Sequence, residues 1–126
     1  MANILIDFPK RKTITTDILK EKNMVNEDFK IKIADFGFSR EAHGMIESYC
    51  GTPLNMAPEI LEKKLYNAKA DIWSLGVILF ELITGFPPFK AQTKSELKAN
   101  IKKGEFKLPK EYQVSVECLD FINKCL

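Results

Sequence analysis

Histidine and arginine are scarce in this sequence. His43 is the only histidine among 126 residues, which excludes a metal site built from several imidazole ligands. Arg11 and Arg40 are the only arginines. The formal net charge is only +2, which is too small to indicate nucleic acid or a charged membrane surface as a partner. We therefore expect no nucleic-acid partner.

Cysteine is also rare. The chain contains Cys50, Cys118 and Cys125, and no pair of them has the Cys-x-x-Cys spacing. An odd number of cysteines without that spacing does not suit a disulfide framework. Free thiols are typical of a reducing compartment, so we expect a cytoplasmic protein.

Long apolar segments are missing. The longest apolar stretch, Ile72–Ile83, is interrupted by Ser74, Gly76 and Glu81, and it is shorter than the roughly 20 residues that a helix needs to cross a bilayer. We expect no membrane span, and the first residues do not have the pattern of a signal peptide. Hydrophobic residues still make up 45% of the chain, which is enough for a globular core.

The apolar pattern predicts a short hairpin followed by helices. Asn3–Ile6 indicates a buried strand and Lys30–Ala34 a half-buried one, because the first is an apolar run and the second alternates. As an antiparallel pair they would place Asn3 and Asp35 side by side. Helices are expected over 57–61, 70–84 and 94–103, and from Ser115 onward. The helix over 70–84 is apolar almost all round, which predicts burial on every side.

Residues 8–29 differ from the rest of the chain in composition. They are mostly polar and include the basic triplet Lys10–Lys12, which is more often solvated than part of a phosphate site. Polar connections of this length are uncommon in compact domains. We therefore predict a surface insertion between the two strands, with one short helix over residues 17–24.

The most informative stretch runs from Asp35 to Glu59. It opens with Asp-Phe-Gly at 35–37 and closes with Ala-Pro-Glu at 57–59, with Cys-Gly-Thr-Pro at 50–53 between them. An Asp after a strand supplies the carboxylate oxygen that Mg²⁺ prefers, and a Gly near it lets the backbone turn. The alternative is a solvated turn at Asp35 and an ordinary helix start at Pro58.

These motifs resemble the activation segment of eukaryotic protein kinases. The runs IKIADFGFSR, YCGTPLNMAPEIL and YNAKADIWSLGVILFELITGFPPF look most like the autophagy-initiating Ser/Thr kinases. The resemblance implies a mainly α fold, the carboxyl-terminal large lobe of a two-lobed α+β parent, with one small β-hairpin. Residues 1–126 would then be a partial kinase domain that begins at the end of the catalytic loop.

The resemblance also implies the activity, which is transfer of the γ-phosphoryl group of ATP to Ser or Thr of protein substrates. Asp35 and Asn3 resemble the residues that hold Mg²⁺, and Leu5 resembles the residue beneath the adenine ring of the nucleotide. The alternatives are an amino-terminal Asn without a role and, for Leu5, a plain core residue of the strand; the two interpretations of Leu5 can both hold.

The loop between the two motifs resembles the substrate-binding and regulatory part of the family. Gly51, Thr52 and Pro53 correspond to the loop that receives the substrate peptide, and Thr52 to the residue that bonds the catalytic Asp. Ser48 stands where many members carry the activating phosphate; the alternatives are an unmodified loop Ser and, as a weaker candidate for the phosphate, Tyr49. Asn55 departs from the family, which generally has Tyr or Trp there.

Two carboxylates resemble structural residues of the family. Glu59 corresponds to the Glu that pairs with a late Arg, although no Arg follows Arg40. Asp71 corresponds to a buried Asp that holds the catalytic-loop backbone; the alternative is a helix cap, since a carboxylate is favoured near a helix start.

The main departure from the family concerns missing parts. The catalytic Asp of the His-Arg-Asp motif should precede Asn3, and the 126 residues contain neither it nor the small lobe. The chain is therefore expected to be a fragment that is inactive alone. The alternative function is a catalytically dead, kinase-derived scaffold or interaction module.

Overall fold

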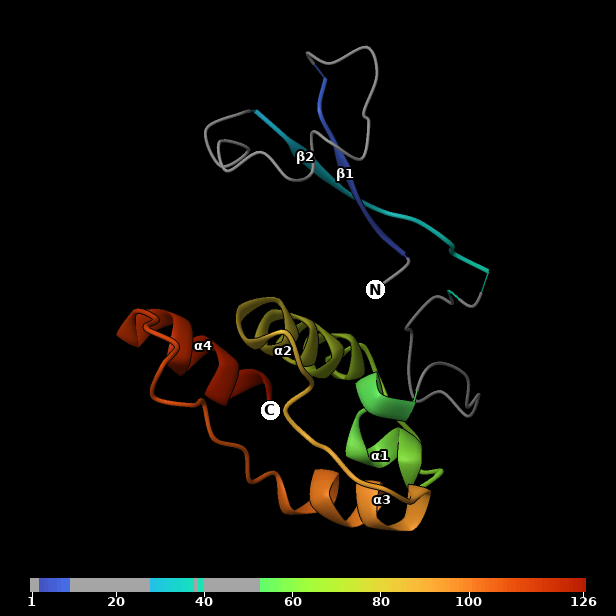
Figure 1. Cartoon of the computed structure of the whole chain (residues 1–126). Coiled ribbons are helices and arrows are strands. Elements are labelled where there is room, and N and C mark those ends of the chain that lie inside the picture. Colours follow the sequence, from blue (N-terminus) through green and yellow to red (C-terminus); the bar gives the residue numbers. More distant parts are fainter. Residues whose placement is uncertain (1–2, 10–27, 38, 40–52) are drawn as a thin grey trace. The chain divides into compact units, whose positions relative to one another are not determined.

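The computed structural model describes residues 3–9, 28–37, 39 and 53–126. Contacts divide the chain into two compact units, Met1–Ser39 and Arg40–Leu126, and Figure 1 colours both along the sequence. The expected helix over 17–24 lies outside the described residues. None of the described helices is both long and apolar enough to span a bilayer.

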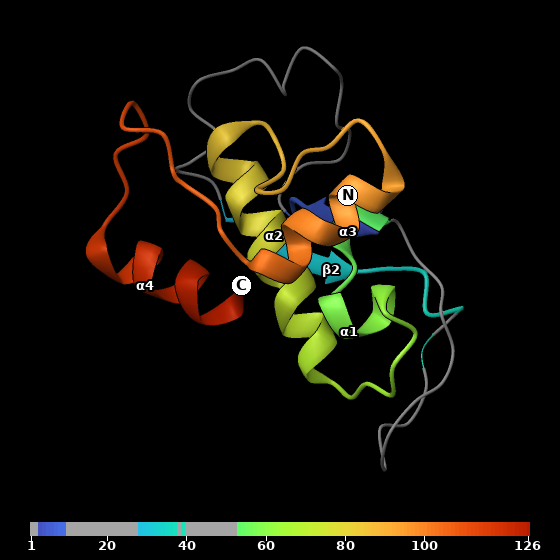
Figure 2. The ribbon, with the colours of Figure 1, turned by 90° about the horizontal axis from the view of Figure 1, so that it is seen from below.

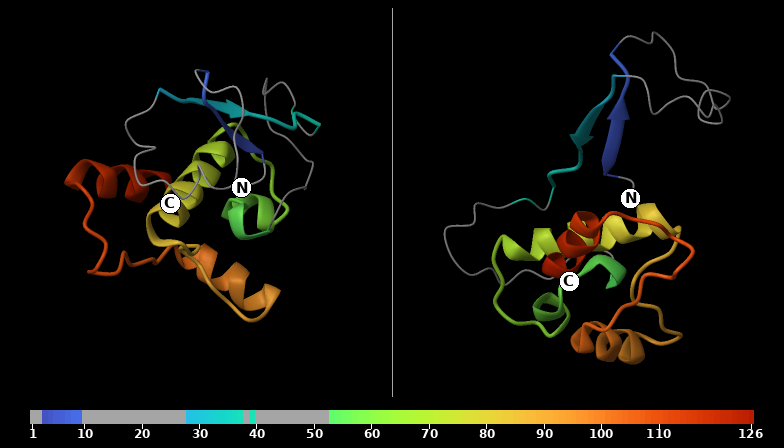
Figure 3. Two further views of the ribbon diagram at one scale, coloured as in Figure 1. Left: turned by 45° about the horizontal axis from the view of Figure 1, so that its top comes forward. Right: turned by 90° about the vertical axis from the view of Figure 1, so that its left-hand side faces the viewer.

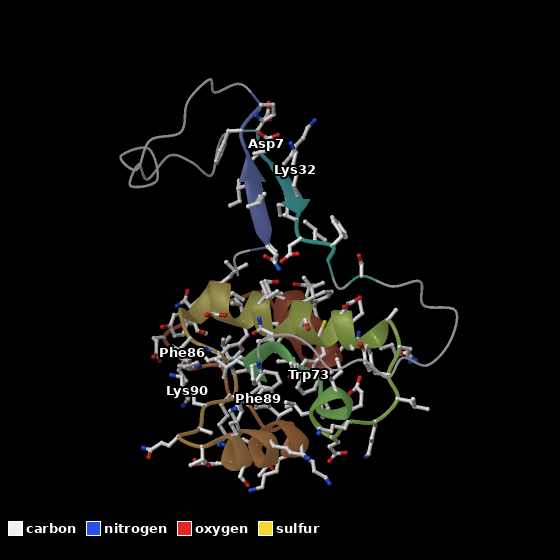
Figure 4. All side chains as sticks on the ribbon, turned by 90° about the vertical axis from the view of Figure 1, so that its right-hand side faces the viewer. Asp7, Lys32, Trp73, Phe86, Phe89 and Lys90 are labelled. Atoms are coloured by element: carbon white, nitrogen blue, oxygen red, sulfur yellow. The ribbon has the colours of Figure 1, made fainter. Side chains whose placement is uncertain are left out.

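The first unit contains a two-stranded antiparallel hairpin. Strand β1 (Ile4–Asp7) pairs with strand β2 (Lys30–Ile33), and the right-hand view of Figure 3 shows the two strands side by side. An ion pair between Asp7 and Lys32, 2.7 Å long, joins the strands near the end of β1 (Figure 4). The predicted hairpin is confirmed.

The predicted burial of these strands is wrong. Leu5 in β1 keeps 49% of its surface exposed, and Ile33 in β2 keeps 69%. All four residues of β2 are exposed. The physical reason is that a two-stranded sheet has no second layer of its own on which to bury a face.

Two aromatic rings close the hairpin where residues 8–29 leave it. The Phe8 and Phe29 ring centroids lie 6.4 Å apart with a tilt of 55°, and Phe8 is buried at 5% exposure. Phe8 is thus a packed residue, whereas residues 10–27 lie outside the described part of the chain. The surface insertion over 8–29 remains a prediction.

That prediction can be tested by shortening the segment. Replacing residues 9–28 by Asn-Gly, with Phe8 and Phe29 kept, is expected to change the melting temperature by only a few degrees, because the entropy of loop closure depends weakly on length. Replacing all of 8–29 should cost more, since the ring pair is lost. Thermal unfolding of both variants measures this, and loss of soluble protein in the shorter replacement would show that the segment packs on the fold.

The second unit is helical and contains one 3-10 turn. Helix α2 lies at its centre, with α4 on one side and α1 and α3 on the other (Figures 1 and 2). The elements are η3 (Pro53–Asn55), α1 (Pro58–Leu61), α2 (Lys69–Thr84), α3 (Lys94–Lys103) and α4 (Val116–Cys125). The four α-helices are those that the sequence predicts, whereas η3 was not predicted.

The core of this unit lies between α1, α2 and α3. Trp73 of α2 stacks on Phe89, with ring centroids 5.7 Å apart and planes within 10° (Figure 4). Val77, Leu97 and Ile101 are buried in the same cluster. Large aromatic and branched side chains supply most of the apolar area that such a core removes from water.

Burial of α2 on every side is not what the structure has. Trp73 and Val77 face the core, but Leu75 is 44% exposed and Leu82 is 65% exposed. The neighbouring helices α1, α3 and α4 cover only part of the surface of this helix, which is 16 residues long. An all-round apolar pattern therefore identified a central helix correctly and overstated its burial within the described part of this unit.

A small network of hydrogen bonds stabilises the carboxyl end of α2. The Thr84 hydroxyl lies 2.8 Å from the carbonyl oxygens of both Phe80 and Phe86. The Tyr112 hydroxyl donates to the Thr84 carbonyl at 2.9 Å. Gly85 then takes a left-handed conformation with φ of 78°, which favours glycine. The connection that follows α2 therefore leaves the helix in a defined direction.

A side-chain hydroxyl caps the start of each of the helices α3 and α4. The Thr93 hydroxyl accepts a hydrogen bond from the Glu96 N–H at 3.2 Å, and the Ser115 hydroxyl accepts one from Cys118 N–H at 3.2 Å. The Glu96 carboxylate accepts from the Gln92 N–H at 3.1 Å, one residue earlier than in the standard capping box.

Candidate active site

The hairpin brings Asn3 and Asp35 together at one end of its strands. Ile4 lies opposite Ile33, and the Ala34 N–H donates to the Asn3 carbonyl at 2.8 Å. The Asn3 Nδ2 then donates to Asp35 Oδ2 at 3.4 Å. The predicted juxtaposition of these two side chains is therefore present.

Asp35 has an unusual backbone. Its φ is 64°, in the left-handed region that costs non-glycine residues about 1–2 kcal/mol and that Asp tolerates better than most. Its Oδ1 accepts from the Gly37 N–H at 3.4 Å, and the Ser39 N–H donates to the Phe36 carbonyl at 3.0 Å. A strained position held in a local turn is typical of functional residues.

The donor atoms at this end suit a hard cation that arrives with ligands of its own. Asp35 offers carboxylate oxygens, and a 180° rotation of the Asn3 amide offers a third oxygen. Within the described residues, no group of three or more His, Cys, Asp or Glu side chains is placed to hold a metal. Mg²⁺ fits such a site, because it commonly takes one or two carboxylates together with phosphate oxygens and water.

Leu5 lies on the same hairpin, in β1. Its side chain is half-exposed, so it offers an apolar surface that no described neighbour fully covers. The alternative of an ordinary buried strand residue is not what the structure has. A role beneath adenine remains a prediction.

The loop with Ser48, Gly51 and Thr52 lies outside the described residues. Pro53, the last residue of the expected substrate loop, is exposed and begins η3. The Ser74 hydroxyl donates to the carbonyl of Asn55 at 2.8 Å and so ties the end of this loop to α2. Sequence reasoning missed Ser74; a hydroxyl within an otherwise apolar helix was the available signal.

The two carboxylates expected to be structural lie at helix starts. Glu59 is half-buried in the first turn of α1. Asp71 is in the first turn of α2 and is exposed. A negative charge at this position interacts favourably with the helix dipole. The role of Asp71 in holding the catalytic-loop backbone remains a prediction.

Glu62 is a charged residue that sequence reasoning missed. Its carboxylate lies 2.5 Å from the Lys64 ammonium and 3.1 Å from that of Lys102 in α3. The side chain keeps only 15% of its surface exposed. The hydrogen bonds from Lys64 and then Lys102 lower the pKa of Glu62 from 4.5 to about 2. The pair with Lys102 joins the end of α1 to α3.

This pKa predicts a pH dependence. A carboxyl whose pKa is lower in the folded protein contributes stability above its unfolded pKa near 4.5, and that contribution is lost as pH falls toward about 2. Glu62→Gln should therefore lower the melting temperature at pH 7 and have little effect near pH 2. Glu111→Gln, an exposed Glu without an ion pair to another described residue, is the control. Equal effects of Glu62→Gln at both pH values would contradict the ion-pair explanation.

Comparison with known proteins identifies the family of this chain. The protein kinase domain family matches residues 4–126, so the chain belongs to the protein kinase family. It is 39% identical over 127 residues to the serine/threonine-protein kinase ATG1c of Arabidopsis thaliana, covering 86% of this chain and 17% of that protein. It is 48% identical over 100 residues to atg1 of Aspergillus fumigatus, covering 76% and 10%.

A third relative widens the comparison. The serine/threonine-protein kinase kin-29 of Caenorhabditis briggsae is 43% identical over 113 residues, covering 87% of this chain and 14% of that protein. The predicted resemblance to the autophagy-initiating kinases is confirmed by the ATG1 matches. The chain spans less than a quarter of the length of these relatives.

Proposed function

We propose that this chain is the middle and later part of the large lobe of a Ser/Thr protein kinase, and that it supplies the metal-binding and substrate-positioning side of phosphoryl transfer from ATP. The observation that carries this proposal is the Asn3–Asp35 pair at the end of the hairpin, 3.4 Å apart, with Asp35 in a left-handed conformation. Relatives described as serine/threonine-protein kinases support protein Ser and Thr as acceptors.

In this proposal Asp35 and Asn3 hold Mg²⁺ on the phosphates of ATP. The ion, when bound, neutralises the charge that develops on the transferring group. Asp35 contributes a full negative charge toward it and Asn3 a neutral oxygen. The exposed side chain of Leu5 offers an apolar surface on which a flat adenine ring can lie.

Acceptor binding falls to the following loop. Gly51, Thr52 and Pro53 would place the substrate peptide, and the Ser74 hydrogen bond to Asn55 would keep the end of that loop in register with α2. Glu59 and Asp71 would support the loop and the catalytic backbone from the starts of α1 and α2. Protein substrates and a cytoplasmic location belong to the same proposal.

The test is phosphoryl transfer by the full-length protein that carries this chain. With radiolabelled ATP and Mg²⁺, transfer to a Ser or Thr peptide is expected, and transfer to the matching Tyr peptide is not. Tight protein binding without any transfer would instead support the kinase-derived scaffold. Transfer to the Tyr peptide alone would contradict the proposed specificity.

Ser48 is predicted to be the activating phosphorylation site. A phosphate there adds about −1.5 to −2 charge and orders a loop when a cation pairs with it. Ser48→Ala in the full-length protein should lower kcat by about tenfold or more, and phosphatase treatment of the wild type should do the same. Tyr49→Phe, next in the chain, is the control. Full activity of Ser48→Ala would exclude the assignment.

A further inference from the structure

Positive charge is concentrated around α3. Between Lys90 and Glu111 the chain carries seven lysines and three glutamates, although the net charge of the whole chain is only +2. Two of these charges are already engaged: Lys102 pairs with Glu62, and the Glu96 carboxylate caps the Gln92 N–H. The remaining lysines of this segment are exposed.

A groove opens on this charged segment. It has a volume of about 310 Å³ and is lined by Pro88, Phe89, Lys90, Asn100, Lys103 and Glu105. The first three of these residues belong to the connection after α2, Asn100 and Lys103 belong to the end of α3, and Glu105 follows that helix. Among the residues that the structure describes, neither Lys90 nor Lys103 has a carboxylate within ion-pair distance.

Both the backbone and the side chain of Lys90 make contacts that restrict its position. Its carbonyl accepts a hydrogen bond from Asn100 Nδ2 at 2.9 Å, and its ammonium lies 3.7 Å from the centre of the Phe86 ring (Figure 4). Phe86 is itself fixed by edge contacts with Phe80 and Tyr112, at 6.1 and 6.2 Å between centroids. A cation over an aromatic face keeps its charge while its side-chain freedom is reduced, so less entropy is lost when an anion binds.

We propose that this groove is a docking site for an acidic segment of a partner protein, with a carboxylate or phosphoserine side chain between Lys90 and Lys103. The argument for this occupant is charge complementarity: two lysines that have no carboxylate partner among the described residues line a groove of about 310 Å³. The Asn100 amide adds a polar group beside them. Glu105 also lines the groove and opposes an anion there, which gives a variant of opposite sign. The site lies in the helical unit and uses none of the residues assigned to phosphoryl transfer.

The first experiment measures binding to the full-length protein by fluorescence anisotropy. The probes are a labelled peptide of alternating Glu and Gly, the same peptide with phosphoserine in place of Glu, and a Gln version. Binding of either acidic peptide but not the Gln version is expected, with affinity falling several-fold between low and 300 mM salt. The ratio of the two acidic peptides tells carboxylate from phosphate. Equal binding of the Gln peptide would overturn the proposal, and so would binding only to anionic phospholipid vesicles.

Variants of matched charge separate the groove from net charge. Lys90→Gln and Lys103→Gln should each weaken binding of the acidic peptide about 1.4- to fivefold, the range of an exposed charge pair, while Glu105→Gln should strengthen it. Lys94→Gln removes the same charge from the first turn of α3, outside the groove, and should change little. Equal weakening by Lys94→Gln and Lys90→Gln would overturn the proposal.

A further variant, at Phe86, tests the positioning of Lys90. Phe86→Leu keeps an apolar residue but removes the ring under the ammonium, and it should weaken the acidic peptide about twofold. Unchanged melting temperatures of the lysine variants, which alter only exposed side chains, confirm that folding is intact. Transfer to a short neutral peptide should stay at the wild-type rate in Lys90→Gln; docking and catalysis can thus fail independently.

Discussion

Asp35→Asn is expected to reduce phosphoryl transfer by the full-length protein to below about 1% of the wild-type rate. Loss of one preorganised electrostatic group in a phosphoryl-transfer site typically costs a factor of about 10²–10³. Asn keeps the size of Asp and also tolerates the left-handed backbone at φ of 64°, so the fold should be retained. The measurement is kcat with radiolabelled ATP over a range of Mg²⁺ concentrations.

A matched control lies on the same hairpin. Asp7→Asn removes the ion pair with Lys32 and therefore the same charge from the same unit, but at the other end of the strands. It should retain most of the activity. If both variants lose activity equally, hairpin stability and not metal binding explains the effect.

Purified residues 1–126 alone should show no transfer, because the 126 residues contain no counterpart of the catalytic Asp before Asn3. Activity of that chain that vanishes in its Asp35→Asn variant would contradict this.

Gly76→Ala is expected to destabilise the helical unit. A Cβ at this position would lie 2.5 Å from the Cβ of Cys125 and 3.1 Å from Leu126 Cδ2, where α4 crosses α2. In an exposed helix the same change would stabilise by about 1 kcal/mol. Overpacking of a helix contact typically costs about 1–3 kcal/mol, and about 4–8 °C per kcal/mol is usual for a domain of this size. Thermal unfolding followed by circular dichroism measures the net loss.

The clash can be removed from the other side. Cys125→Gly deletes the Cβ that Gly76→Ala would meet, at the last residue of α4. The double variant should therefore be more stable than the sum of the two single losses predicts, with a coupling of about 1 kcal/mol or more in a double-mutant cycle. Strict additivity would show that α4 does not pack on Gly76 in solution.

The helices were predictable because their signals are local. Thr93 and Ser115 cap α3 and α4 through backbone groups only three residues away, and Gly85 ends α2 through its own φ. The candidate metal pair was predictable for a similar reason, since antiparallel pairing of two short strands fixes which strand ends meet. Ser74, Glu62 and the Lys90 groove were not predictable, because each depends on contacts between segments distant in sequence.

The sequence by itself determined the family, the order of the elements and the residue types at the candidate site, because motifs, caps and periodicity are properties of neighbouring residues. Only the tertiary structure decided which sides of these elements are covered. The sequence pattern predicts that Leu5 and Leu82 are buried, but both are exposed in the fold. Trp73 and Phe89, by contrast, are 16 positions apart in the sequence and stack on each other. Burial depends on which other elements pack against a face, and the residues of that face do not by themselves specify those elements.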